Sequence, residues 1–198
     1  CAAYALGREV FPERPVIALA AATFIAFLPQ FIFMSASVNN DVAAAAIASW
    51  TVVILIRFLR AGRVSLAALL GALVGLAALS KLSGLSVIPL VALGLLWWAW
   101  RERRWAEALQ RGLAVLAVAV VVGGWWYGRN WLTYGDPLGL QTMLDVVGRR
   151  DAFGLADLLF ELEGLWLSFW GLFGWFNVLM ARWVYYVYDA LFIVGAVG

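Results

Sequence analysis

Long runs of apolar residues, separated by short groups of charged and polar residues, dominate the chain. Residues 64–80 and 84–100 contain no charged side chain and are separated only by residues 81–83. A helix needs about 20 largely apolar residues to cross a bilayer, and these runs approach that length. A transmembrane β-barrel would need segments in which apolar and polar residues alternate, whereas residues 66–79 do not alternate. The pattern therefore predicts an all-α fold, a polytopic transmembrane helical bundle.

The same pattern predicts six membrane spans within one transmembrane domain, residues 1–198. The predicted spans are residues 15–34, 42–58, 64–80, 84–100, 112–127 and 183–198. Residues 128–182 form the predicted outward-facing loop and interfacial region, in which the aromatic, glycine-rich stretch 165–180 spans, re-enters or lies as a helix in the interface. Because the chain has no initiator methionine and ends in an apolar run, we interpret it as an internal fragment of a larger membrane protein.

Arginine indicates which way the spans run. Two groups of arginines fall in loops on one side of the predicted membrane: Arg57, Arg60 and Arg63 in one loop, and Arg101, Arg103, Arg104 and Arg111 in another. The positive-inside rule makes that side cytoplasmic. The opposite, outer side then holds residues 35–40, the tight turn at Lys81 and residues 127–182. Arg149, Arg150 and Arg182 lie on the outer side in this scheme and run against the rule.

Composition supports a membrane protein and excludes several kinds of chemistry. Charged residues make up 13% of the chain, against about 25% in soluble domains. The chain has no histidine, which excludes histidine metal sites and histidine acid–base catalysis. Its single cysteine excludes an internal disulfide. It also lacks a basic nucleic-acid-binding patch, so we expect no nucleic-acid partner. Gly71 and Gly75 form a small-xxx-small pair suited to helix packing within the chain or to a dimer interface.

Polar residues on the outer side are the best candidates for chemistry. Lys81 is the only lysine and lies between two apolar runs, a costly place unless its ammonium reaches headgroups, water or an anionic partner. It is either an anchor that extends to the interface or a cation for the phosphate of a lipid-linked substrate. Asn39, Asn40 and Asp41 fit a helix N-cap. Alternatively, Asp41 is a base or metal ligand at the membrane surface, supported by Asn40.

Further candidates follow the fifth span. Arg129 is either a charge that breaks the positive-inside pattern or a second phosphate contact, with Asn130 beside it. Asp136 lies in a Gly-Asp-Pro turn sequence and either makes the turn or lines the site. The aromatic block 168–177 contains Trp170 and Trp175. This block predicts an interfacial helix. The helix either has no catalytic role or covers a groove in which its aromatic rings stack on sugars.

Short motifs in a fixed order carry a family resemblance over most of the chain. They are Pro29-Gln30-Phe31, Asn39-Asn40-Asp41, Gly75-Leu76-Ala77 running into Lys81, Trp126-Tyr127-Gly128-Arg129-Asn130, and Tyr134-Gly135-Asp136-Pro137. The set resembles the GT-C superfamily of membrane glycosyltransferases, specifically the family 39-like enzymes that use phospholipid-carrier sugars.

The resemblance implies a function. It implies transfer of a sugar from a polyprenyl-phosphate donor to a glycan, lipid or protein acceptor on the outer face of a bacterial inner membrane, with a divalent cation nearby. Asp41 matches the family's second outward acid, with Asn40 beside it, and Lys81 and Arg129 match its phosphate-side cations. Asn130, Asp136, Trp170 and Trp175 are then candidate substrate contacts. The family's leading acid belongs to a loop that this sequence does not contain.

Two alternatives stand beside this interpretation. The first is a non-catalytic membrane subunit or lipid-binding scaffold of a larger complex, and the second is a transporter. Transporters usually place polar groups near the bilayer midplane, whereas the polar groups here fall at the ends of the runs. The sequence leaves the oligomeric state open.

Overall fold

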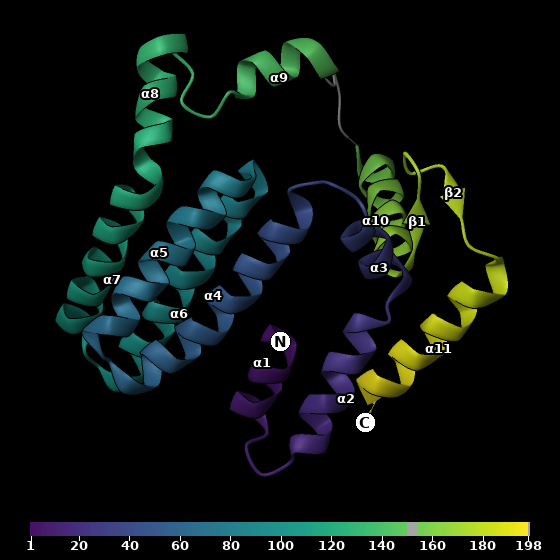
Figure 1. The fold of residues 1–198 in the computed structure, drawn as a ribbon, viewed down its shortest axis with the longest axis horizontal. Helices are drawn as coiled ribbons and strands as arrows, with labels where there is room; N and C mark the ends of the chain where they lie inside the picture. Colours follow the sequence, from purple (N-terminus) through teal and green to yellow (C-terminus); the bar gives the residue numbers. More distant parts are fainter. Residues whose placement is uncertain (150–153, 198) are drawn as a thin grey trace. The chain divides into compact units, whose positions relative to one another are not determined.

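A computed structural model describes residues 1–149 and 154–197, and helices dominate them (Figure 1). The helices are α1 (Ala2–Val10), α2 (Pro15–Ala26), α3 (Pro29–Ala36), α4 (Asp41–Ala61), α5 (Val64–Ser80), α6 (Val87–Glu102), α7 (Trp105–Ala119), α8 (Trp125–Tyr134), α9 (Leu140–Val147), α10 (Leu155–Trp170) and α11 (Arg182–Val197). A 3₁₀ turn, η1 (Leu82–Ser86), leads into α6, and a π-helical turn, η2 (Val120–Gly124), joins α7 to α8. The predicted all-α fold is confirmed.

The chain forms two compact units. The first comprises Cys1–Ala22 and Asn39–Gly148, and the second comprises Thr23–Val38 and Arg149–Gly198. Nothing in the apolar pattern marks this division. The assignment of residues 1–198 to a single transmembrane domain stays a prediction.

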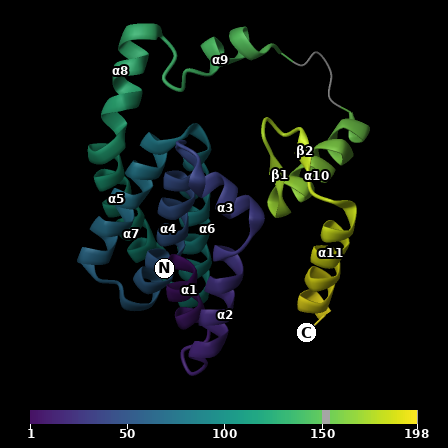
Figure 2. The same ribbon diagram turned by 45° about the vertical axis from the view of Figure 1, so that its right-hand side comes forward.

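Helices α4 to α7 form the core of the first unit. Helix α5 packs against α4 and α7, and α6 packs against the same two helices (Figure 1). The fully buried side chains include Phe58 and Leu70. At the other end of α4 from Asp41, Glu9 of α1 binds Arg57 (2.6 Å) and Arg60 (3.0 Å), which fixes α1 beside α4 (Figure 2).

Glycine allows α5 and α7 to approach closely. A Cβ atom added at Gly75 would lie 2.8 Å from Cβ of Val122 and 2.9 Å from the carbonyl oxygen of Ala119. A Cβ atom at Gly123 would lie 2.7 Å from the carbonyl oxygen of Gly75. Packing of the Gly71 and Gly75 pair within the chain, one of the two predicted alternatives, is therefore confirmed.

Within residues 1–149 and 154–197, three helical segments are long and apolar enough to cross a membrane: Asp41–Ala61, Leu82–Glu102 and Trp105–Tyr134. Helix α5 is apolar but shorter. These segments contain the predicted spans 42–58, 84–100 and 112–127, and the protein is a multi-pass membrane protein. The last segment differs from the prediction, because it continues to Tyr134 where an outward loop was expected from residue 128. It ends at Gly135, whose φ of 67° is the left-handed conformation typical of a helix C-terminus.

The predicted first span, residues 15–34, is a bent pair of helices. The axis of α3 is bent by 60° away from the direction of α2. Pro29 explains the bend, because proline lacks the N–H for an intrahelical hydrogen bond and forces the preceding residue out of the α region. Leu28 is accordingly extended, with φ −61° and ψ 126°.

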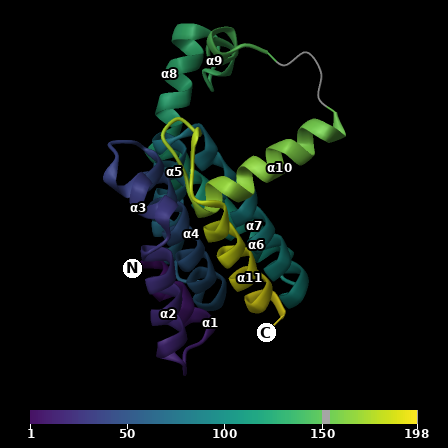
Figure 3. The same ribbon diagram turned by 90° about the vertical axis from the view of Figure 1, so that its right-hand side faces the viewer.

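In the second unit, α10 leads into a small hairpin that precedes α11 (Figure 3). Strands β1 (Leu172–Phe173) and β2 (Val178–Leu179) pair antiparallel. An aromatic helix was expected across residues 168–177, but the helix ends at Trp170. Gly174 and Phe176 have φ values of 65° and 60°, which an α-helix cannot contain. The Tyr185 hydroxyl fixes the hairpin by donating a hydrogen bond to the carbonyl of Gly171 (2.5 Å).

Candidate functional site

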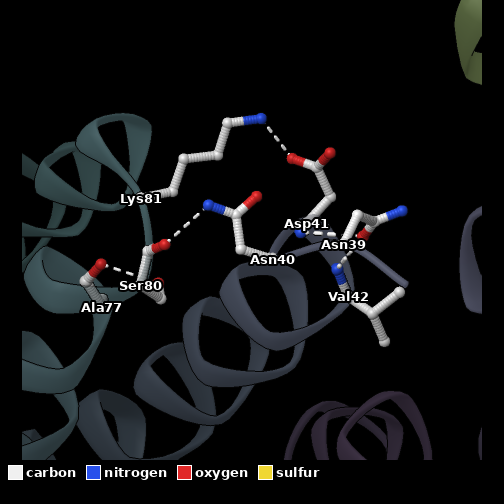
Figure 4. A network of polar contacts seen from close by, with 7 residues as sticks. All are labelled: Asn39, Asn40, Asp41, Val42, Ala77, Ser80 and Lys81. Atoms are coloured by element: carbon white, nitrogen blue, oxygen red, sulfur yellow. Dashed lines mark hydrogen bonds and ion pairs between the residues drawn. The ribbon is translucent and has the colours of Figure 1, made fainter. Parts of the chain in front are cut away.

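Two polar contacts join the start of α4 to the end of α5 (Figure 4). The Lys81 ammonium forms an ion pair with the Asp41 carboxylate. Beside it, Nδ2 of Asn40 donates a hydrogen bond to the carbonyl oxygen of Ser80 (2.9 Å). The structure thus brings together three of the predicted site residues, Asn40, Asp41 and Lys81, although Lys81 follows Asp41 by 40 positions in the sequence.

Local helix chemistry explains how the Asp41 carboxylate is placed. Oδ1 of Asn39 accepts hydrogen bonds from the amides of Asp41 (3.0 Å) and Val42 (3.4 Å). These amides belong to the first turn of α4 and have no partner inside the helix, so Asn39 does the predicted capping. The carboxylate of Asp41 is directed to Lys81 (Figure 4).

A tight turn places Lys81. The hydroxyl of Ser80 donates to the carbonyl of Ala77 (2.8 Å), and the amide of Gly84 donates to the carbonyl of Lys81 (2.9 Å). A Cβ atom at Gly84 would lie only 2.0 Å from the Ala77 carbonyl oxygen, so this turn excludes any larger residue there. The side chains of Lys81 and Asp41 are 41% and 38% exposed. Exposed ion pairs contribute about 0–1 kcal/mol, so Lys81 can exchange this carboxylate for another anion at little cost.

Arg129 lies on α8, one turn from the end of that helix. Its guanidinium lies over the rings of Trp126 (5.4 Å) and Tyr134 (5.8 Å). Its Nη1 donates to Oδ1 of the buried Asn130 (3.3 Å). The structure therefore gives Arg129 partners on its own helix, rather than joining it directly to the Asp41–Lys81 pair.

Tyr127 makes a contact that was not predicted, although the residue lies in a motif that was singled out from the sequence. Its hydroxyl donates to the carbonyl of Ala78 on α5 (2.5 Å). This bond attaches α8 to α5 just before the Lys81 turn. The signal that could have suggested this contact is a tyrosine close to glycines that let helices pack tightly, since a buried tyrosine hydroxyl usually has a hydrogen-bond partner.

Asp136 makes the turn that its sequence predicts. Its carboxylate accepts backbone N–H bonds from Gln141 (2.7 Å), Gly139 (3.0 Å) and Leu138 (3.2 Å). These bonds, that from Gln141 above all, lower the pKa of the carboxyl below its usual value. A role of Asp136 in lining the site stays a prediction.

The two candidate tryptophans belong to the second unit and differ sharply in exposure. Trp170 is 3% exposed and stacks on Tyr188, with ring centroids 4.6 Å apart. Trp175 is 95% exposed at the hairpin turn. Trp170 therefore serves the aromatic core that supports the hairpin, whereas Trp175 presents a free ring face. Asp189, isolated in the sequence, accepts a hydrogen bond from Nε1 of Trp166 (2.8 Å).

The described residues do not form a metal site of their own. Across residues 1–149 and 154–197, no three histidine, cysteine, aspartate or glutamate side chains come together to hold an ion. Asp41 alone would be too few ligands for a magnesium or calcium ion, which takes six or more oxygens.

Comparison with known families decides the relationship of the chain. Residues 1–127 match the family of dolichyl-phosphate-mannose-protein mannosyltransferases. The chain belongs to this family. The match covers α1 to α7 and the start of α8, and it includes Asn40, Asp41 and Lys81 but ends before Arg129.

Membership confirms the resemblance to GT-C membrane glycosyltransferases, whose members use a lipid-linked sugar. No curated protein matches the sequence at a significant level. No solved structure matches it either.

Proposed function

We propose that this protein moves a sugar from a polyprenyl-phosphate carrier to a glycan, lipid or protein acceptor on the outer face of a bacterial inner membrane. Family membership supports the reaction class. The observation that carries the assignment to this site is the Asp41–Lys81 pair at the helix ends, because it places a base beside a cation. The arginine-rich loops at the other end of α4 and α6 support the outward orientation of this pair.

In the proposed reaction, Asp41 is the general base. The acceptor hydroxyl loses its proton to the Asp41 carboxylate, and its oxygen forms a bond to the anomeric carbon of the donor sugar. The bond between that carbon and the phosphate oxygen breaks, and its electron pair leaves with the lipid phosphate. Asn40 positions this carboxylate through its bond to Ser80, which holds the start of α4 against the Lys81 turn.

Lys81 has two roles in this proposal. Before the donor binds, it neutralises Asp41. When the donor binds, its ammonium turns to the phosphate and stabilises the charge that develops on the leaving group, and Asp41 becomes available to the acceptor. Arg129 is a second phosphate contact, oriented by Asn130 and the rings beside it. The exposed ring of Trp175 is available to stack on a sugar, and Asp136 shapes the segment after α8.

The test measures transfer from a panel of radiolabelled polyprenyl-phosphate sugars by the full chain in vesicles. We expect Asp41→Asn to lower the rate by about 100-fold or more, the typical contribution of a general base. Lys81→Met should lower it to a similar extent. Glu13→Gln, the same change of an acid to an amide at an exposed residue outside the site, should leave the rate unchanged.

A charge exchange separates catalysis from a structural role of the pair. The double variant Asp41→Lys with Lys81→Asp can still form an ion pair, but it moves the base to the other helix end. We expect it to insert and fold, as judged by gel filtration, and to remain inactive. Restored transfer would mean that the pair only holds α4 to α5. Wild-type transfer in both single variants would leave a non-catalytic subunit as the better assignment.

A further inference from the structure

A second polar site lies at the opposite end of the first unit, and we call it the arginine cavity. Its volume is about 700 Å³, and the ends of α4 and α6 and the start of α7 enclose it. Its polar and aromatic lining includes Arg60, Arg101, Arg104, Arg111, Trp97 and Trp98. Since α4 has 21 residues and begins at Asp41, the cavity is about 30 Å from the Asp41–Lys81 pair.

Arg111 is held firmly in this cavity. Its guanidinium lies over the ring of Trp98 (4.1 Å) and near that of Phe58 (5.5 Å). Its Nη2 donates to Oε1 of Glu107 (2.6 Å). Gly62, at the C-terminal end of α4, lies next to the Arg111 guanidinium. A Cβ atom at Gly62 would lie 2.3 Å from Nη2. Contacts from three helices thus fix the position and plane of this cation.

One donor of Arg111 lacks an acceptor among the described residues. The Nη1 atom is buried and makes no hydrogen bond within the part of the chain that the structure describes. The side chain as a whole is 16% exposed. An unsatisfied buried donor costs about 1–3 kcal/mol, and more where the group is charged. The guanidinium is therefore fixed with one N–H that lacks an acceptor within residues 1–149 and 154–197.

The charges around the cavity also favour an anionic ligand. Five arginines share three carboxylates: Arg57 and Arg60 bind Glu9, Arg104 and Arg111 bind Glu107, and Arg101 lies 3.9 Å from Glu102. Two positive charges are left over in this group (5 − 3 = 2). Glu102 is the one carboxylate among the lining residues.

We infer that the arginine cavity binds one phosphate group, from the headgroup of an anionic phospholipid or from free phosphate. Guanidinium groups match phosphate oxygens with parallel N–H bonds, and a phosphate oxygen here would give Nη1 of Arg111 its acceptor. Trp97 and Trp98 suit the headgroup level of a bilayer. This site is independent of the proposed sugar transfer, because it uses none of the same residues.

The experiment compares lipid retention by the full chain and three variants. The protein is reconstituted in phosphatidylcholine vesicles with a minor fraction of phosphatidylglycerol, extracted in detergent and washed in about 1 M sodium chloride, where a Debye length of about 3 Å suppresses diffuse attraction. Bound lipid is then counted by mass spectrometry. Arg101→Gln and Arg111→Gln remove lining residues, and Arg103→Gln removes the same charge from an exposed residue outside the lining.

We expect wild type to retain phosphatidylglycerol over phosphatidylcholine, and each lining variant to lower the affinity about tenfold through the loss of charge-assisted bonds. Arg103→Gln should stay within about twofold, because only diffuse attraction is lost. If Arg111→Gln fails to fold, Arg101→Gln decides, since the Arg101 side chain is 64% exposed and lies over the exposed ring of Trp97.

A second arm identifies the source of the phosphate. Inorganic phosphate is added to the protein in phosphatidylcholine micelles, with sodium chloride at equal ionic strength as the control, and thermal unfolding is followed. A stabilising shift in wild type but not in Arg101→Gln means that the cavity accepts free phosphate. Retention of phosphatidylglycerol without this shift assigns the cavity to a headgroup. Equal retention of both lipids together with no phosphate shift, or equal losses in Arg101→Gln and Arg103→Gln, would overturn the inference.

Discussion

Because α5 packs closely on α7 at Gly75, replacing this glycine by alanine should destabilise the first unit. Alanine at Gly75 would place its Cβ 2.9 Å from the Ala119 carbonyl oxygen, a backbone atom that cannot rotate away. Ordinary contact begins at 3.4 Å, so the two helices must separate by roughly 0.5 Å (3.4 − 2.9). Gly128 on α8 is the matched control, because nothing lies within 4 Å of a Cβ added there.

The magnitude follows from two opposing effects. Overpacking in a well-packed core typically costs about 1–3 kcal/mol. Replacing glycine by alanine inside a helix gains up to about 1 kcal/mol, and this gain applies to both sites. It therefore cancels when the two variants are compared. We expect Gly75→Ala to be less stable than Gly128→Ala by about 1–3 kcal/mol.

Equilibrium unfolding measures this difference. The full chain in mixed micelles is titrated with sodium dodecyl sulfate, and tryptophan fluorescence follows the separation of the helices. Gly128→Ala should equal or exceed the wild type in stability, while Gly75→Ala unfolds at a lower detergent fraction. If Gly75→Ala proves as stable as Gly128→Ala, close packing of α5 on α7 does not limit the stability of this unit, and the reasoning fails.

Three further predictions concern single contacts. Pro29→Ala should reduce the 60° bend between α2 and α3, because it restores a backbone N–H; the distance between spin labels on the two helices would increase. Tyr127→Phe should destabilise the first unit by about 1 kcal/mol through loss of the bond to Ala78, measurable in the same detergent titration, and no change would mean that this bond is not formed. The lowered pKa of Asp136 means that its turn is stabilised above the usual carboxyl range, near pH 4, and loses that stability as the pH falls through the folded-state pKa. The protection factor of the Gln141 amide, which is the intrinsic exchange rate divided by the observed rate at each pH, should therefore fall in acid in wild type but not in Asp136→Asn.

The sequence was sufficient for much of the fold, because apolar runs and arginine placement depend on local composition. It also placed Asp41 and Lys81 at the same end of the helices. It could not show that the two side chains pair, since that contact joins positions 40 apart and depends on how α4 packs on α5. Trp170 and Trp175 look alike in sequence but are 3% and 95% exposed, because only the tertiary fold decides which ring the core covers.

The extent of α8 was missed for a different reason. Polar residues after Tyr127 resemble a loop in composition, yet they continue the helix to Tyr134. Intrinsic helix propensity varies little among most residues, so polarity marks the edge of a membrane more reliably than the end of a helix. The hairpin after α10 was missed because its glycine and aromatic residues suit an interfacial helix equally well.

The π-helical turn Val120–Gly124 sets the rotation of α8, the helix that directly follows it. A π-helical turn accommodates about one residue more than an α-helical turn, and one residue corresponds to about 100° around the helix axis. The face that α8 presents is therefore rotated by this angle from where an unbroken α-helix would put it. Tyr127 meets α5 in this setting, and Arg129 faces the rings of Trp126 and Tyr134. The direction in which the Arg129 side chain points is thus set one turn earlier, by the additional residue in the π-helical turn.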